Sequence, residues 1–197
     1  PCHREPTVMD SAALSSVVAE AYADNRPLRV QGGGSKTRLL GRDCDGEVLS
    51  LAEYRGVVDY TPGELVVTAR AGTPIAELTE TLAGENQYLP CLTPDFDGKA
   101  TLGGSLACNL SGYTRPWAGS LRDLVLGTRV INGKGEQLRF GGQVMKNVAG
   151  YDVSRLQAGA LGTLGVITEV SLKVLPLPET AITLAYDCSA PDALDTM

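Results

Sequence analysis

The sequence QGGGSKT at residues 31–37 follows a short apolar run at residues 28–30. Consecutive glycines can adopt positive φ angles and turn successive backbone N–H groups toward one point, which makes a nest for an anion such as phosphate. The serine and threonine can add hydroxyl donors, and the lysine can add a positive charge. A plain flexible turn is the alternative, and three glycines alone favour it. The segment is not a P-loop, because the only Gly-Lys pair followed by a hydroxyl, at residues 98–101, lacks the earlier glycine.

A second glycine-containing segment, TLGGSLACNLSG, covers residues 101–112. A helix that begins here would offer free N–H groups to a phosphate. Its small side chains would also let a large planar ligand lie against the backbone. A tightly packed contact between a helix and a sheet selects small residues as well, so this segment alone leaves the two interpretations about even.

Two further segments carry weaker signals. The glycines of GALGTLG, residues 159–165, are spaced GxxGxxG ahead of a predicted strand, whereas a Rossmann fingerprint needs GxGxxG between a strand and a helix. A nicotinamide Rossmann fold is therefore disfavoured, which leaves either a plain turn or main-chain contact to a nucleotide. In KNVAGYD, residues 146–152, Lys146 and Tyr151 are weak candidates for tuning a flavin ring. A solvated lysine and a surface tyrosine are the preferred interpretation.

Hydrophobic periodicity predicts a mixture of helices and strands. We expect a helix over residues 11–25 after an Asp10 N-cap, and another that starts at Thr73-Pro74 with Pro74 at its first helical position. A turn-rich stretch near residues 90–100 indicates a boundary between two lobes. The expected strands cover residues 28–30, 47–51, 56–60, 65–71, 128–132, 136–140, 166–175 and 182–186, and the expected hairpin turn is at residues 133–135. A last helix is expected to start within residues 192–197.

Composition excludes several functional classes. The 197 residues are 43% apolar and 20% charged, as in a globular protein of one domain or two closely joined lobes. The net charge of −6, without a basic run, disfavours nucleic-acid binding. No stretch reaches the roughly 18 apolar residues of a membrane helix, and we expect no signal peptide. Five scattered cysteines indicate reduced thiols and a cytoplasmic protein, and the one histidine, His3, is a poor candidate for hydrolase or zinc chemistry.

Taken together and in this order, the segments resemble the FAD-binding domain of the vanillyl-alcohol oxidase or PCMH-type flavoprotein superfamily. Within it, they are most similar to the FAD-binding subunits of bacterial glycolate oxidases. The resemblance covers about residues 27–178. Its most particular parts are RPWAGSLRDLVLGTRVI at residues 115–131 and VMKNVAGYDVSRL at residues 144–156.

The resemblance implies a two-lobed α+β fold with FAD between the lobes. The FAD-binding domain would cover residues 1–178, with lobes at about 1–95 and 96–178, and residues 179–197 would begin a truncated substrate-capping domain. The glycine turn would hold the pyrophosphate, the second segment the pyrophosphate and flavin, and the main chain at residues 165–167 the adenine end. The implied cofactor-binding residues are Gln31, Gly32, Gly33, Gly34, Ser35, Lys36, Thr101, Gly103, Gly104, Ala107, Asn109, Gly165, Val166 and Ile167.

Departures from the family pattern refine these expectations. The first glycine loop has Gly34 and Ser35 where relatives with covalent flavin often carry histidine, which implies noncovalent FAD. Residues 159–165 read GALGTLG where many hydroxy-acid dehydrogenases have GSEGTLG, so a polar role there is in doubt. We expect no metal and no identifiable catalytic base in this chain.

The function implied by the resemblance is oxidation of a small 2-hydroxy acid to the 2-oxo acid by hydride transfer to FAD. Partners would be other glycolate oxidase subunits, with an iron–sulfur subunit as a candidate among them, and the protein would lie in the cytoplasm or peripheral to the inner membrane through them. One alternative is a non-catalytic FAD-carrying or assembly subunit whose chemistry occurs in a homologous partner. A scaffold without flavin and an enolpyruvyl-sugar reductase-like enzyme are the others.

Overall fold

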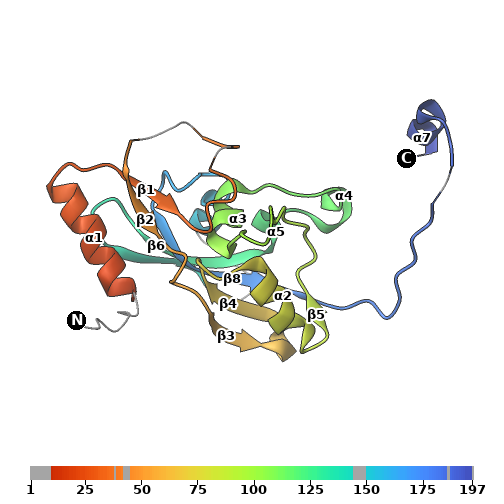
Figure 1. Cartoon of the computed structure of the whole chain (residues 1–197). Helices are drawn as coiled ribbons and strands as arrows, with labels where there is room; N and C mark the ends of the chain where they lie inside the picture. The colour runs from red at the N-terminus through yellow and green to blue at the C-terminus, as the bar shows by residue number, and fades with distance from the viewer. Residues whose placement is uncertain (1–9, 38, 42–44, 144–149, 186, 197) are drawn as a thin grey trace, which may run out of the picture.

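The computed structural model describes residues 10–37, 39–41, 45–143, 150–185 and 187–196. Its largest element is a five-stranded antiparallel sheet with the strand order β3-β4-β8-β6-β7 (Figure 1). The sheet strands are β3 (Val57–Thr61), β4 (Val66–Arg70), β6 (Val125–Ile131), β7 (Gln137–Gly141) and β8 (Val166–Lys173). Two smaller sheets pair β1 (Leu28–Gln31) with β2 (Glu47–Ser50) in parallel and β5 (Gln87–Tyr88) with β9 (Leu175–Pro176) in antiparallel. The α+β class expected from the sequence is confirmed.

Short helices complete the fold. The helices are α1 (Ser11–Ala23), η1 (Pro62–Glu64), α2 (Ile75–Ala83), α3 (Leu102–Cys108), α4 (Arg115–Ala118), α5 (Leu121–Leu124), α6 (Val153–Leu156) and α7 (Ala190–Thr196). The Asp10 side chain accepts a hydrogen bond from the backbone N–H of Ala13 at 2.7 Å, so Asp10 is the N-cap of α1 as predicted. Pro74 is the N-cap of α2 and not its first helical residue, and β6 begins at Val125, three residues before the predicted start.

The core lies between the large sheet and α3. Val170 and Leu172 of β8 are fully buried, as are Leu102 and Leu106 of α3, which packs against β4 and β8. Side chains alternate between the two faces of a strand, so Glu169 and its neighbours on that side point away from the core. The sheet therefore holds α3 at a fixed place on its apolar face.

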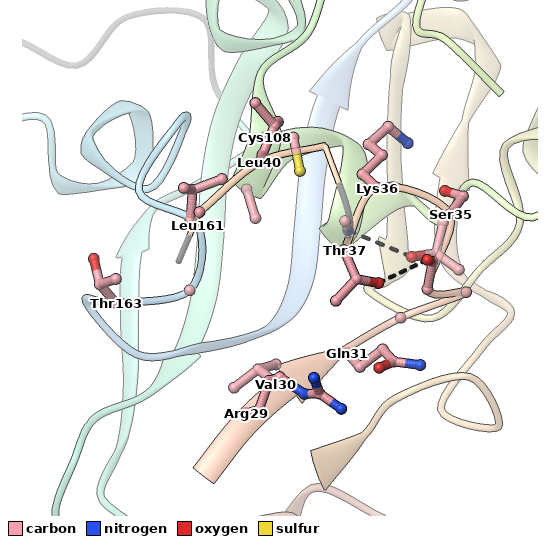
Figure 2. A pocket seen from close by; sticks show the side chains of 18 of the residues that line it. Arg29, Val30, Gln31, Ser35, Lys36, Thr37, Leu40, Cys108, Leu161 and Thr163 are labelled. Carbon is pink, nitrogen blue, oxygen red and sulfur yellow. Dashed lines mark hydrogen bonds between the residues drawn. The ribbon is translucent and has the colours of Figure 1, made fainter. Parts of the chain in front are cut away.

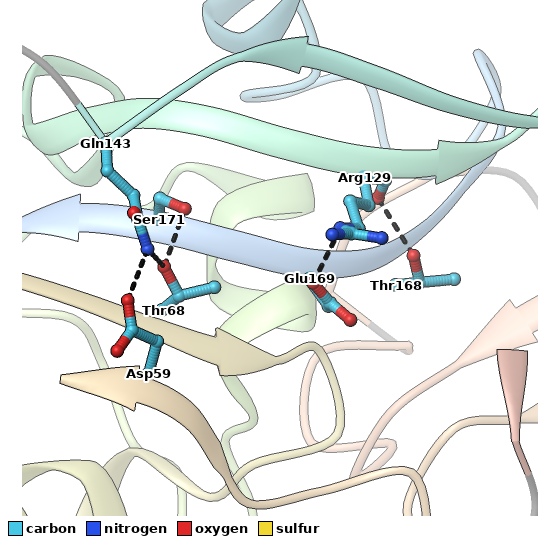
Figure 3. A network of polar contacts seen from close by, with 7 residues as sticks. All are labelled: Asp59, Thr68, Arg129, Gln143, Thr168, Glu169 and Ser171. Atoms are coloured by element: carbon cyan, nitrogen blue, oxygen red, sulfur yellow. Dashed lines mark hydrogen bonds and ion pairs between the residues drawn. The ribbon is translucent and has the colours of Figure 1, made fainter.

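The other face of the sheet carries a polar network (Figure 3). The Thr68 and Ser171 hydroxyls lie 2.8 Å apart, and the Gln143 side chain joins them to Asp59 on β3 through an Nε2–Oδ2 hydrogen bond of 2.6 Å. Further along the sheet, Nε of Arg129 lies 2.9 Å from a carboxylate oxygen of Glu169, and the Thr168 hydroxyl donates to the Arg129 carbonyl. These contacts link β3, β4, β6 and β8 across the sheet.

The sheet crosses the predicted lobe boundary. Along its whole length β4, which precedes residue 95, pairs with β8, which follows it. The change from one sheet to another falls between Ser50 and Val57, because β1 and β2 form their own parallel pair. The lobe limits at 1–95 and 96–178 stay predictions, as does the domain limit at residue 178.

The predicted strand over residues 182–186 is wrong. Residues 182–185 have no regular structure, and Tyr186 lies outside the described residues. Ile182 is 84% exposed, and none of the described strands pairs with this segment. An unpaired strand is not stable in water. The expected final helix is present as α7, which begins two residues before the predicted start and lies away from the rest of the fold in Figure 1.

Candidate functional site

A pocket of about 510 Å³ opens between the glycine turn, one side of α3 and the loop at residues 161–163 (Figure 2). The turn contributes all of residues 32–37, and β1 leads into it from below in Figure 2. The α3 segment contributes Thr101, Gly104, Ala107 and Cys108. Thr101, Gly104 and Ala107 are spaced three residues apart, and Cys108 follows Gly104 by four, so these positions lie on one side of the helix. The two glycine-containing segments of the sequence thus form opposite walls of one pocket.

The glycines of the turn are required by close packing. A Cβ atom on Gly33 would overlap the Lys99 carbonyl oxygen, and one on Gly32 would overlap the Thr101 hydroxyl. Gly34 has a φ of 71°, in the left-handed region that side chains rarely adopt. The turn is therefore fitted against the segment that leads into α3, and the plain flexible turn weighed at first does not describe it.

The backbone of the turn leaves a row of donors without partners. Among the described residues, no acceptor takes a hydrogen bond from the backbone N–H groups of Gly32 through Lys36. The turn is held instead by the Thr37 hydroxyl, which donates to the Gly34 carbonyl at 2.7 Å. Backbone N–H groups are almost always paired in folded proteins. Five successive unpaired groups on the wall of a pocket fit an anionic ligand.

The start of α3 does not offer free N–H groups to a phosphate, which was one of the two interpretations of this segment. The N–H groups of Leu102 and Gly103 donate at 2.8 Å to the carbonyls of Thr73 and Ala71, and that of Ser105 donates to Thr101. The Gly104 N–H donates to the Thr101 side chain, the N-cap, at 3.4 Å. The phosphate interpretation is wrong for the helix start, because the helix follows directly on a bridge between Pro74 and Thr101, which brings other carbonyls within reach. The small residues of α3 serve packing and the pocket wall.

Among the residues that the structure describes, the pocket is lined by two cations and no carboxylate. Lys36 is only 6% exposed, and its ammonium lies 5.5 Å from the centre of the Phe96 ring. Burial lowers the pKa of Lys36, against the opposing influence of Cys108 and Asp95. Arg29 on β1 is half-buried, and its buried Nε atom has no hydrogen-bond partner. Burial also raises the pKa of the Cys108 thiol, while Lys36 opposes this shift.

Most of the predicted cofactor residues lie around this pocket. Gln31 and Thr101 line it together with the turn, Gly104 and Ala107. Gly103, Gly165 and Ile167 line a smaller cavity of about 50 Å³ that shares Thr101, Gly104 and Ala107 with it. Val166 and Gly165 line a third cavity of about 440 Å³ beneath α1, which shares Leu28 and Val30 with the main pocket.

Two of the other candidates do not contribute to the pocket wall. Asn109 is the C-cap of α3 with a φ of 47°, and its side-chain oxygen accepts a hydrogen bond from the Arg122 N–H at 3.3 Å. Tyr151 is 96% exposed and does not line the pocket. Lys146 lies outside the described residues.

Sequence reasoning missed Arg29, which lines the pocket. Cys108 and residues 161–163 also line it and lie within segments that the sequence singled out, although they were not among the implied cofactor-binding residues. Strand alternation gave a usable signal for Arg29, because it stands two residues before Gln31 and so projects to the same side of β1. Nothing in the sequence places residues 161–163 opposite the glycine turn. That neighbourhood comes from the Leu161 N–H, which donates to the Ala107 carbonyl of α3 at 2.9 Å.

Fold and pocket together define a nucleotide-binding α+β domain with a site for an anion. Residues 7–141 match the FAD binding domain family, and the chain belongs to that family. FAD is therefore its cofactor, and the resemblance to PCMH-type flavoproteins is confirmed.

Individual proteins within and near this family are similar to the chain. The chain is 50% identical over 184 residues to glycolate oxidase subunit GlcE of Escherichia coli, covering 93% of this chain and 52% of that protein. It is 33% identical to glycolate oxidase subunit GlcD of Bacillus subtilis over 77% of this chain and 33% of that one. A solved alkyldihydroxyacetonephosphate synthase superposes with a TM-score of 0.70 at 25% identity, over 85% of this chain and 31% of that chain. The chain thus spans about half the length of the first of these relatives.

Two features are absent from the part of the chain that the structure describes. No helix there has the length and apolar character needed to cross a membrane. The same residues contain no group of three or more side chains suited to hold a metal ion.

Proposed function

We propose that the chain is the FAD-binding component of a glycolate oxidase-like complex that oxidises a small 2-hydroxy acid to the 2-oxo acid. The observation that carries this proposal is the row of unpaired N–H groups from Gly32 to Lys36 on the pocket wall. A diphosphate needs several donors that converge on it, and backbone N–H groups of a glycine turn supply them. The similarity to two glycolate oxidase subunits supports the substrate class.

Within this proposal, FAD binds noncovalently along α3. The residues that bind it are those expected from the sequence, without Asn109, whose side chain caps α3 and binds the Arg122 backbone instead. The turn at residues 31–36 takes the pyrophosphate. Gly104 and Ala107 give the flavin a flat wall, and the main chain at residues 165–167 meets the adenine end.

The protein's own residues bind and orient. The bound flavin supplies the chemistry, by accepting a hydride from the α-carbon of the acid. Gly32 and Gly33 let the turn pack closely against residues 99–101, which holds its N–H groups in place on the pocket wall. No side chain of the described pocket wall is assigned as a base, since its ionisable groups are Arg29, Lys36 and Cys108. The substrate-binding groups would come from other parts of the enzyme or from partner subunits, an iron–sulfur protein among them, in the cytoplasm or at the inner membrane.

The test is an absorption spectrum of the purified protein with added FAD, before and after denaturation and filtration. Oxidised-flavin bands that pass into the filtrate are expected for noncovalent FAD. Anaerobic addition of glycolate to the loaded protein should then bleach the bands. Bands that persist with glycolate would favour the alternative, a subunit that carries FAD while a homologous partner performs the chemistry. Bleaching by a nicotinamide donor instead would indicate a reductase of the same fold, and no bands with excess FAD would overturn the assignment.

A further inference from the structure

Arg29 and Lys36 are the cationic residues of the described pocket wall, which contains no aspartate or glutamate. This is unusual for a chain of net charge −6. Neither side chain has an ion pair or a hydrogen bond among the described residues. The Lys36 ammonium lies over the face of Phe96, and Asp95 acts on it electrostatically without forming an ion pair.

Three other arginines of the described residues have ion-pair partners. Arg26 pairs with Asp24 and Glu47, Arg129 pairs with Glu169, and Arg155 pairs with Asp152. All three of these arginines are more accessible to water than Lys36. Burying a charge without a partner is unfavourable, so the two pocket cations destabilise the protein when it is empty. A ligand with negative charge would remove that penalty.

The two cations flank the glycine turn in the chain. Arg29 precedes it on β1 and Lys36 ends it, and Figure 2 shows their side chains on opposite sides of the turn. The unpaired N–H groups lie between them in sequence. In an environment of low dielectric, both charges raise the electrostatic potential at the turn without needing direct contact with a ligand.

We infer that Arg29 and Lys36 are a pair of counter-charges for the cofactor's diphosphate, left uncompensated in the empty protein, and that they make the pocket select a doubly phosphorylated nucleotide. This inference rests on the proposed function for the identity of the ligand. Arg29 joins the residues expected to bind the cofactor. At both positions, the charge that favours cofactor binding lowers the stability of the apoprotein.

The experiment measures binding of FAD and of inorganic pyrophosphate to the apoprotein by calorimetry, at low and high KCl. The variants are Arg29→Met, Lys36→Met and the double variant, which keep side-chain length and remove charge. Arg29→Lys and Lys36→Arg keep the charge. The matched controls are Arg139→Met, on an exposed part of β7, and Lys134→Met, at the exposed hairpin turn. Thermal unfolding of each apoprotein is recorded alongside.

Each Met variant should lower the affinity for both FAD and pyrophosphate by about tenfold or more at low salt. The loss should shrink in high KCl, because salt screens charges that reach solvent. The charge-keeping variants and the controls should stay within about threefold of the wild type. The Met variants should unfold at the same or a higher temperature than the wild-type apoprotein.

Three results would overturn the inference. The first is unchanged ligand affinity in the Met variants. The second is an equal loss of affinity in Arg29→Lys and Lys36→Arg, which keep the charge. The third is a lower unfolding temperature together with weaker binding, which would show that the side chains act through packing. Failure of the proposed function looks different. If the protein binds pyrophosphate through both cations but does not bind FAD, the counter-charge role stands and the proposed function is overturned. If it binds neither ligand, both proposals are overturned.

Discussion

At the scale of single residues, Lys36 is the position where stability and binding conflict most directly. Its side chain is 6% exposed and has a ring for a neighbour in place of a carboxylate. The titratable groups that face it are the Cys108 thiol from α3 and the Asp95 carboxylate from the segment before α3. Asp95 is itself engaged, because it accepts a hydrogen bond from the Ala100 N–H at 3.2 Å.

The first prediction concerns the pH dependence of apoprotein stability. Burial lowers the pKa of Lys36 below its ordinary value of 10.5. Between the lowered pKa and 10.5, the unfolded chain binds more protons than the native state. The contribution of Lys36 to the free energy of unfolding therefore increases as pH rises through this range. Lys36→Met lacks this contribution. Its stability advantage over the wild type, measured by urea unfolding, should be largest at neutral pH and should shrink as pH approaches 10.5. A gap that widens with pH would contradict the argument.

The second prediction concerns the reactivity of three cysteines. Cys188 is exposed, Cys108 is partly buried on the pocket wall, and Cys91 is buried, with burial raising its pKa to about 12. Alkylation requires the thiolate, so labelling should be fastest at Cys188 and slowest at Cys91. Peptide mass mapping after timed iodoacetamide treatment measures each site. FAD should slow labelling at Cys108 and leave Cys188 unchanged, and equal protection of both would argue against a ligand in this pocket.

At the scale of elements, the glycine turn and the start of α3 act as one unit. Gly32 and Gly33 touch residues 99–101, and the Leu161 loop is tied to α3 through the Ala107 carbonyl. The sheet holds α3 through the fully buried Leu102 and Leu106. The geometry of the turn therefore depends on the sheet, although no residue of the turn belongs to it.

The third prediction tests this contact. In Gly33→Ala, the new Cβ atom would overlap the Lys99 carbonyl oxygen, which is backbone and cannot rotate away. We expect a loss of about 1–3 kcal/mol in the free energy of unfolding, as for other overpacked sites, together with weaker FAD binding. Gly133→Ala is the matched control, because a Cβ atom there meets nothing within 4 Å. Urea unfolding and FAD titration of both variants measure the effect, and equal behaviour of the two would refute the proposed contact.

At the scale of the whole molecule, the described core ends before the C-terminal segment does. Val174 is the last residue of the core, and the Leu177 N–H donates to the Asn86 carbonyl at 2.8 Å. Beyond residue 178, Ile182, Leu184 and Leu194 are at least 70% exposed. The segment therefore adds little to the stability of the fold described here.

The fourth prediction follows from that arrangement and tests the proposed domain limit. A chain that ends at residue 178 should unfold within about 2 °C of the 197-residue chain, since the loss of exposed residues changes the free energy of unfolding by well under 1 kcal/mol. Its affinity for FAD should be the same. Thermal unfolding and FAD titration of the two chains make the comparison, and a lower unfolding temperature would place part of the domain beyond residue 178.

The sequence alone determined the local features of this protein. Asp10 caps a helix, the hairpin turns at residues 133–135, and the strand after residue 165 alternates between core and polar face, since each depends on neighbours a few residues away. The resemblance also led to the family and to the glycine turn. Only the tertiary structure decided which polar groups remain free. The N–H groups at the start of α3 are taken by Ala71 and Thr73, those of the turn are not, and Arg29 reaches the same pocket from β1. Hydrogen-bond partners distant in sequence are chosen by how the chain packs, and no local pattern of residues specifies them.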